Sequence, residues 1–266
     1  MNETRPFLKW AGGKRWLLQK HPEIFEIEFE RYIEPFLGGG SVFFALLPQN
    51  ACLSDVNVEL VTTYTAIRDD WQGVESILRV HQARHSKEHY YEVRRAIPSE
   101  KVKQAARFIY LNRTCWNGLY RVNLKGEFNV PIGTKTNVIW EGELEKVSKA
   151  LSGVDIKACD FEERIDNAGS GDLVFVDPPY TVHHNMNGFL KYNQNLFSWQ
   201  DQIRLRDAVA RAHTRGAKII VTNAAHSSVV ELYKGVGVIS ETERLSVISG
   251  KNAGRGRQAE ILIRCC

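Results

Sequence analysis

Short apolar runs separated by amphipathic segments dominate the chain and predict an α/β fold. Residues 51–54 and 173–176 are mostly apolar, and residues 218–223 contain the run Ile-Ile-Val, which predicts buried strands. Leu60, Tyr64 and Ile67 recur at helical spacing between two of these runs. Strands that alternate with helices are typical of a doubly wound, largely parallel sheet. We therefore expect such a sheet, closed by a terminal hairpin.

A run of three glycines follows the first predicted strand. Residues 32–36 predict that strand, and residues 42–47 predict the apolar helix after the glycines. This is the first βα turn of a Rossmann-like sheet, where glycines let a cofactor approach the backbone. The spacing is not GxGxxG, so a dinucleotide is not the first choice. Asp55 ends the second strand, where a carboxylate typically binds ribose hydroxyls, although it could equally cap the next helix.

The tetrapeptide at residues 177–180 carries the most specific chemistry of the sequence. Asp177, Pro178, Pro179 and Tyr180 directly follow a predicted strand, and the prolines hold the backbone rigid. A carboxylate and a carbonyl that both accept hydrogen bonds suit an NH2 group, and a tyrosine face suits a flat ring. We therefore expect the exocyclic amine of a base at this position. The alternative is a strand-terminal turn with an Asp cap.

Two other short segments suit an adenosine-containing ligand. Gly12 and Gly13 permit a tight turn, and the ring of Trp10 and the ammonium of Lys14 flank it. The alternative is a core tryptophan beside a surface lysine. Asp160-Phe161 follows a predicted strand at 154–158, and this pair suits an adenine amino group and ring. A polar loop residue followed by a core phenylalanine is the competing interpretation.

Charge is unevenly distributed along the 266 residues. The net charge is +4, but residues 79–125 contain eleven basic and three acidic residues, so this segment carries +8 and the rest carries −4. A basic segment in an otherwise acidic chain is the pattern expected for a polyanion partner, although a solvated helical surface is the alternative. Arginines interleaved with aromatic residues, as at Arg113, Trp116 and Arg121, suit nucleic acid better than a substrate lid or an oligomer surface.

The rhythm of strands and helices is interrupted between residues 73 and 137, which are mostly helical in pattern with a hairpin at 122–130. We therefore predict a catalytic domain at 1–72 and 138–266 and a target-recognition domain at 73–137. No apolar run approaches the roughly 20 residues needed to span a membrane. Five cysteines lack CxxC or histidine spacing, which predicts reduced thiols, no structural zinc and a cytoplasmic protein. A P-loop is missing, which argues against a nucleotide hydrolase.

Six motifs in a fixed order give the chain a resemblance to a known family. They are KWAGGK at 9–14, EPFLGGGS at 34–41, SDVN at 54–57, NRTCWNGLYRVNLKGEFNVPIG at 112–133, CDF at 159–161 and DPPY at 177–180. From about residue 6 to residue 222, this order resembles the Dam-type DNA adenine-N6 methyltransferases. The resemblance implies a Rossmann-like methyltransferase sheet with an inserted, mainly helical target-recognition domain.

The resemblance also implies S-adenosylmethionine as cofactor and assigns residues by motif position. Catalytic positions are Asp177, Pro178 and Tyr180. Cofactor-binding positions are Trp10, Lys14, Phe36, Gly38, Asp55, Asp160, Phe161 and Asp177. DNA-binding positions are Lys9, Arg113, Trp116, Asn117, Leu119, Arg121 and Pro131. Trp116 stands where Dam enzymes carry a smaller intercalating aromatic, so the resemblance supports a wedge role and leaves the sequence preference open.

We therefore expect an enzyme that methylates N6 of adenine in double-stranded DNA, within GATC, by base flipping. The alternatives are the same chemistry at another adenine-containing site and a DNA-binding protein without catalysis. Methylation of RNA or of a protein amide is a further rival, opposed by the Dam-like hairpin and by the basic Trp/Arg segment. We expect a DNA-associated cytoplasmic protein that is monomeric when free and needs no metal or membrane.

Overall fold

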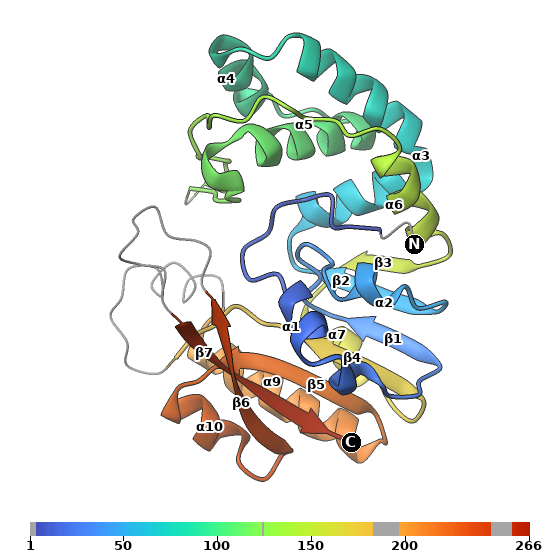
Figure 1. Ribbon diagram of the computed structural model, residues 1–266, viewed down its shortest axis with the longest axis vertical. Coiled ribbons are helices and arrows are strands. Elements are labelled where there is room, and N and C mark those ends of the chain that lie inside the picture. The colour runs from blue at the N-terminus through green and yellow to red at the C-terminus, as the bar shows by residue number, and fades with distance from the viewer. Residues whose placement is uncertain (1–3, 124, 183–196, 246–256) are drawn as a thin grey trace. The chain divides into compact units, whose positions relative to one another are not determined.

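The computed structural model describes residues 4–123, 125–182, 197–245 and 257–266 (Figure 1). The chain divides into two compact units. Unit 1 comprises 1–25, 37–48 and 55–158, and unit 2 comprises 26–36, 49–54 and 159–266. The predicted target-recognition segment, 73–137, falls wholly within unit 1. Its boundaries stay a prediction, because unit 1 also holds the amino-terminal segment and the glycine turn.

A seven-stranded, mostly parallel sheet confirms the predicted fold class. Its strands are β1 (Arg31–Glu34), β2 (Ala51–Asp55), β3 (Asp155–Ala158), β4 (Asp172–Val176), β5 (Lys218–Ala224), β6 (Val238–Leu245) and β7 (Arg257–Cys265). Their order is β3-β2-β1-β4-β5-β7-β6. β1 is parallel to β2 and β4, and β4 is parallel to β5. β7 is antiparallel to both β5 and β6, so it lies between them and forms the expected hairpin.

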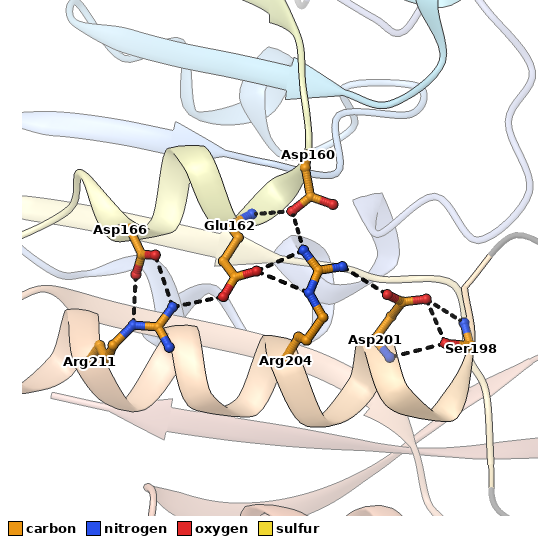
Figure 2. Close-up of polar contacts among 7 residues, drawn as sticks. All are labelled: Asp160, Glu162, Asp166, Ser198, Asp201, Arg204 and Arg211. Carbon is orange, nitrogen blue, oxygen red and sulfur yellow. Dashed lines mark hydrogen bonds and ion pairs between the residues drawn. The ribbon is translucent and has the colours of Figure 1, made fainter.

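Helices α7 (Phe161–Asp166), α9 (Trp199–Thr214) and α10 (Ser227–Tyr233) belong to unit 2. α9 buries Leu205, Val209 and Ala212 against β4, β5 and β7, and these three residues are four and three positions apart, on one face of the helix. Ser198 and Asp201 form a reciprocal capping box at its start (Figure 2). This capped helix supplies the arginines that face α7.

Unit 1 is largely helical, as expected for the segment after residue 73. Its helices are α1 (Arg15–Lys20), η1 (Pro22–Phe25), α2 (Phe43–Leu46), α3 (Val58–Ala83), α4 (Lys87–Arg95), α5 (Lys101–Thr114), η2 (Trp116–Gly118) and α6 (Glu143–Leu151). α3 and α5 pack along each other (Figure 1). The predicted hairpin is minimal, with an isolated antiparallel bridge between Val122 and Phe128.

Histidines of α3 and α4 meet on one buried tyrosine of α5. Nδ1 of His81 and Nε2 of His89 are 3.0 Å apart, and their rings lie 5.0 Å and 5.7 Å from that of Tyr110. Burial lowers the pKa of His81 to about 4, and the nearby charges of His89 and Arg84 act in the same direction. The packing therefore favours a neutral His81.

This pKa predicts a loss of stability on acidification. The folded pKa of about 4 lies below the unfolded value of 6.5, so the unfolded chain binds more protons between these pH values. The contribution of neutral His81 to the free energy of unfolding is complete above pH 6.5 and is lost as the pH falls toward 4. Between pH 7.5 and 5, we expect the free energy of unfolding measured with urea to fall by about 1–2 kcal/mol more in wild type than in His81→Gln. His213→Gln, at an exposed site on α9, should behave as wild type. Equal pH dependence in His81→Gln and wild type would contradict the prediction.

Candidate functional site

The Asp-Pro-Pro-Tyr tetrapeptide lies directly after β4, at the carboxyl end of a central strand of unit 2. Asp177 is partly exposed and Pro178 is buried. Oγ1 of Thr222, on the neighbouring strand β5, donates a 2.6 Å hydrogen bond to Oδ1 of Asp177. Parallel pairing of β4 with β5 therefore fixes one oxygen of the predicted catalytic carboxylate.

Tyr180 is anchored from β7. Its hydroxyl donates a 2.8 Å hydrogen bond to Oε2 of Glu260, whose side chain is buried. Burial raises the pKa of Tyr180 well above its ordinary value, and the charges of Asp177 and Glu260 add to this. The phenol therefore stays neutral at physiological pH, which suits a stacking ring held in one orientation rather than an acid or a base.

Residues 160 and 161, the predicted adenine contacts, begin α7. Asp160 is exposed and is the N-cap of the helix, because its Oδ1 accepts from the backbone N–H of Glu162 at 2.9 Å. Phe161 is buried and its ring stacks on that of Phe36 with centroids 5.3 Å apart. Phe36 itself is partly exposed. The phenylalanine pair thus forms an apolar wall, and Asp160, the residue before Phe161, adds a carboxylate next to it.

Asp55 and the glycine turn are joined within unit 1. Oδ2 of Asp55 accepts from the N–H of Gly38 at 3.0 Å, and Oδ1 accepts from the N–H of Asn57 at 2.9 Å. Burial raises the pKa of Asp55, and the hydrogen bonds from Asn57 and Gly38 oppose that rise. Asn57, and not Asp55, caps α3 through the N–H of Leu60. Each carboxylate oxygen keeps a second lone pair, so Asp55 can still accept a ribose hydroxyl.

Trp10 covers the glycine turn of the same unit. Gly38 has φ +48°, and a Cβ added there would lie 2.7 Å from Cδ1 of Trp10. The indole also stacks on the ring of Tyr120, with centroids 5.4 Å apart. Lys14 is buried, not a surface charge, and its Nζ donates to the carbonyl of Gly12 at 2.8 Å. A buried ammonium beside a glycine-rich turn suits a ligand that carries a carboxylate.

Asn112, near the carboxyl end of α5, binds the main chain of Lys9. The N–H of Lys9 donates to Oδ1 of Asn112, and Nδ2 of Asn112 donates to the carbonyl of Lys9, both at 2.9 Å. The side chain of Lys9 crosses Gly118, where an added Cβ would lie 2.3 Å from its Cδ. No local sequence pattern predicts these contacts of Asn112 and Gly118, although both residues lie in the 112–133 motif.

Most of the other predicted DNA contacts gather around η2. Trp116 is 52% exposed, and its backbone N–H donates to the carbonyl of Pro131 at 2.9 Å. Asn117 has φ +55° and is exposed, and Leu119 is partly exposed. Arg121 is exposed and its Nε donates to Oδ1 of Asn129 at 2.8 Å. Unit 1 therefore places an aromatic ring and an arginine on the short loop that follows α5.

Arg113 differs from these residues because it is buried. Its guanidinium donates to the carbonyls of Phe7 and Val138, pairs with Glu143 and lies 4.5 Å from the ring centre of Trp140. Burial lowers the pKa of Arg113. The donors of Arg113 are thus turned toward other residues of unit 1, which indicates a structural role, and its DNA contact stays a prediction. α5 ends one residue later, so neighbouring positions on the chain face opposite surroundings.

Two kinds of feature are missing from the described part of the chain. No helix there is both long and apolar enough to cross a membrane. Across the same ranges, no group of three or more histidine, cysteine or acidic side chains is arranged to hold a metal ion.

Comparison with known proteins places the chain in a family. The family model for D12 class N6 adenine-specific DNA methyltransferases matches residues 10–247. Type II methyltransferase M1.LlaDCHI of Lactococcus lactis subsp. cremoris is 36% identical over 97% of this chain and 94% of its own. The DNA adenine methylase of Vibrio cholerae is 31% identical over 98% of this chain and 96% of its own. The chain therefore belongs to the D12 class of N6 adenine-specific DNA methyltransferases.

Proposed function

We propose that this chain transfers a methyl group from S-adenosylmethionine to N6 of adenine in duplex DNA, within GATC, after the base leaves the helix. Family membership supplies the reaction class. The observation that carries the proposal is the pair of acceptors at the end of β4, the Asp177 carboxylate and the Pro178 carbonyl, beside the neutral ring of Tyr180.

The chemistry needs acceptors because the amine of adenine is a poor nucleophile whose lone pair is delocalised into the ring. The Asp177 carboxylate and the Pro178 carbonyl accept hydrogen bonds from the two N–H groups of the amine, which localises the lone pair on nitrogen. The same acceptors stabilise the positive charge that develops on that nitrogen. Thr222 contributes by holding one oxygen of Asp177 at 2.6 Å, so the carboxylate need not reorganise during the step.

S-adenosylmethionine, when bound, supplies an electrophilic methyl group on a sulfonium centre. In unit 1, the buried ammonium of Lys14 fits the ligand's carboxylate and Asp55 fits its ribose. The assigned contacts of unit 1 are Trp10, Lys14, Gly38 and Asp55. In unit 2, Asp160 has the acceptor chemistry for the adenine amino group, and the partly exposed Phe36 offers the ring. The assigned contacts of unit 2 are Phe36, Asp160, Phe161 and Asp177.

Base flipping follows from access, because N6 of a paired adenine cannot meet both acceptors inside the stack. Tyr180 stacks the extruded ring, and the hydrogen bond from its hydroxyl to Glu260 holds it in position. The exposed ring of Trp116 serves as the wedge that enters the duplex. Lys9, Asn117, Leu119, Arg121 and Pro131 are the assigned DNA contacts around it.

GATC is the proposed site because the motifs resemble those of Dam-type enzymes. Methylation at another adenine-containing site is the second candidate. Trp116 favours it, since Dam enzymes carry a smaller aromatic at that position. Loss of catalysis is disfavoured, because the Asp177 and Tyr180 side chains both keep their anchoring hydrogen bonds.

The test is transfer of labelled methyl groups to a panel of duplexes containing GATC, fully methylated GATC or scrambled sequences. Label that enters unmethylated GATC alone supports donor, target atom and site together. Label at other adenines retains the enzyme and discards GATC. An absence of label on every duplex, with S-adenosylmethionine still bound in calorimetry, would reject the proposed activity.

Arg121→Ala is expected to relax base preference at one position of the target site by about 10- to 100-fold, because arginine fits guanine edges in a bidentate fashion. The measurement compares kcat/KM on duplexes that vary one base pair at a time. Lys103→Ala, an exposed residue of α5 paired with Glu100, is the control and should leave the preference unchanged. A uniform loss on all duplexes would make Arg121 a phosphate contact.

A further inference from the structure

Arg204, on α9, connects the start of α7 to the start of α9 (Figure 2). Its guanidinium reaches three carboxylates of unit 2. Its Nη2 donates to Oδ1 of Asp160 at 2.9 Å and to Oε2 of Glu162 at 2.7 Å, and its Nη1 donates to Oδ1 of Asp201 at 2.9 Å. The planar fork of arginine is suited to such divided contacts, whereas a lysine ammonium is a single point charge.

The contact with Asp160 fixes one carboxylate oxygen and leaves the other. Oδ1 receives both the N–H of Glu162 and the guanidinium of Arg204. Oδ2 accepts no hydrogen bond from any residue within the described ranges, and Figure 2 shows it without a contact to the residues drawn. The side chain of Asp160 is 48% exposed. The carboxylate is thus oriented, with one acceptor available to a ligand.

The same guanidinium also holds the neighbouring ring. The central carbon of Arg204 lies 5.0 Å from the ring centre of Phe161, within the range of a cation–π contact. Phe161 in turn stacks on Phe36. One side chain therefore sets the orientation of the Asp160 carboxylate and supports the aromatic wall next to it.

Electrostatics explains why this needs an arginine. Within the part of the chain that the structure describes, Asp160, Glu162, Asp166 and Asp201 pair with two cations, Arg204 and Arg211 (Figure 2). The hydrogen bond from Arg204 is the main reason that the pKa of Glu162 lies below its ordinary value. Without Arg204, the charges of Asp160 and Glu162 would repel each other, and Asp160 would lose one of its two fixed donors.

We propose that Arg204 is a positioning residue that makes Asp160 a selective acceptor for the 6-amino group of the cofactor's adenine. This inference rests on the proposed use of S-adenosylmethionine. The acceptor oxygen favours an amino group, and it repels the carbonyl oxygen of a hypoxanthine ring at the same position. Arg204 itself does not touch the ligand in this assignment.

Arg211 is a matched control on the same helix. It pairs with the same Glu162 at 2.9 Å and with Asp166 at 2.9 Å. None of its contacts within the described residues involves Asp160 or Phe161. Loss of Arg211 therefore removes one cation from the cluster without releasing the adenine-binding pair.

The experiment measures binding of S-adenosylhomocysteine and S-inosylhomocysteine by calorimetry. Wild type should prefer the adenosyl ligand by about 10-fold or more, since a lost hydrogen bond to a charged group leaves that group unsatisfied. In Arg204→Ala the ratio should fall below about 3-fold, whereas Arg211→Ala should keep the wild-type ratio. Arg204→Lys, which keeps the charge and loses the fork, should lie between the two and carries the test if Arg204→Ala does not fold.

The outcomes separate this inference from the proposed function. If wild type binds neither ligand, the proposed cofactor is wrong. If wild type prefers the adenosyl ligand and the Arg204 variants weaken both ligands equally, Arg204 has only a structural role and the inference is overturned. Equal affinity of wild type for both ligands would also overturn it, because Asp160 would then not select the amino group.

Discussion

Replacement of Asp177 by alanine is expected to slow methyl transfer by at least about 10³-fold, the scale of losing a group that stabilises charge in the transition state. The variant loses the carboxylate that would accept a hydrogen bond from the adenine amine. Its fold should persist, because Thr222 also lies 3.5 Å from the carbonyl of Val176 and keeps a possible acceptor.

Single-turnover methylation of a target duplex is the appropriate measurement, since it isolates the chemical step from product release. Asp177→Asn should be nearly as slow, because an amide replaces one acceptor oxygen with a donor. Asp207→Ala, an exposed residue of α9 paired with Arg206, is the control for loss of a carboxylate and should react as wild type. Near-normal turnover of Asp177→Ala would remove Asp177 from the chemistry.

Arg113→Ala is expected to lower the free energy of unfolding of the protein by about 3–5 kcal/mol, the usual result of removing one partner of a buried ion pair. Glu143 would keep its charge without its cation, and the carbonyls of Phe7 and Val138 would lose their donor. Burial already raises the pKa of Glu143, and the Arg113 charge opposes that rise.

Urea unfolding tests this second prediction. Arg121→Ala is its control, because the same residue type is removed from an exposed site and should cost less than about 1 kcal/mol. The double variant Arg113→Met with Glu143→Leu should recover part of the loss, since no buried charge is left unpaired. Wild-type stability together with weakened DNA binding in Arg113→Ala would instead support the DNA contact expected from the sequence.

The comparison of Arg113 with Arg121 shows where sequence interpretation reaches its limit. Both arginines lie in one basic, aromatic segment, and local pattern treats them alike. Arg113 is buried because its donors meet the carbonyl of Phe7, 106 residues away, and no local pattern contains that contact. The strands were predictable because each is marked by an apolar run in its own segment of the chain. The motif after β4 is likewise contained in consecutive residues.

The insertion of β7 between β5 and β6 was beyond prediction in the same way. Its apolar residues predicted a strand, but the partner of a strand depends on the order of the whole sheet. The supporting residues of the catalytic tetrapeptide depend on that order too. Thr222 contributes through β5 and Glu260 through β7, so neither had a signal in the sequence around residues 177–180.

The position of Glu260 also affects how the protein is made. A ribosome that has completed Tyr180 must add another 80 residues before the carboxylate that anchors this tyrosine exists. Until β7 emerges, β5 has no antiparallel neighbour and presents an open edge. The nascent polypeptide thus passes through a stage in which its catalytic tetrapeptide is present but incompletely held, and in which that edge is available to chaperones or to other chains.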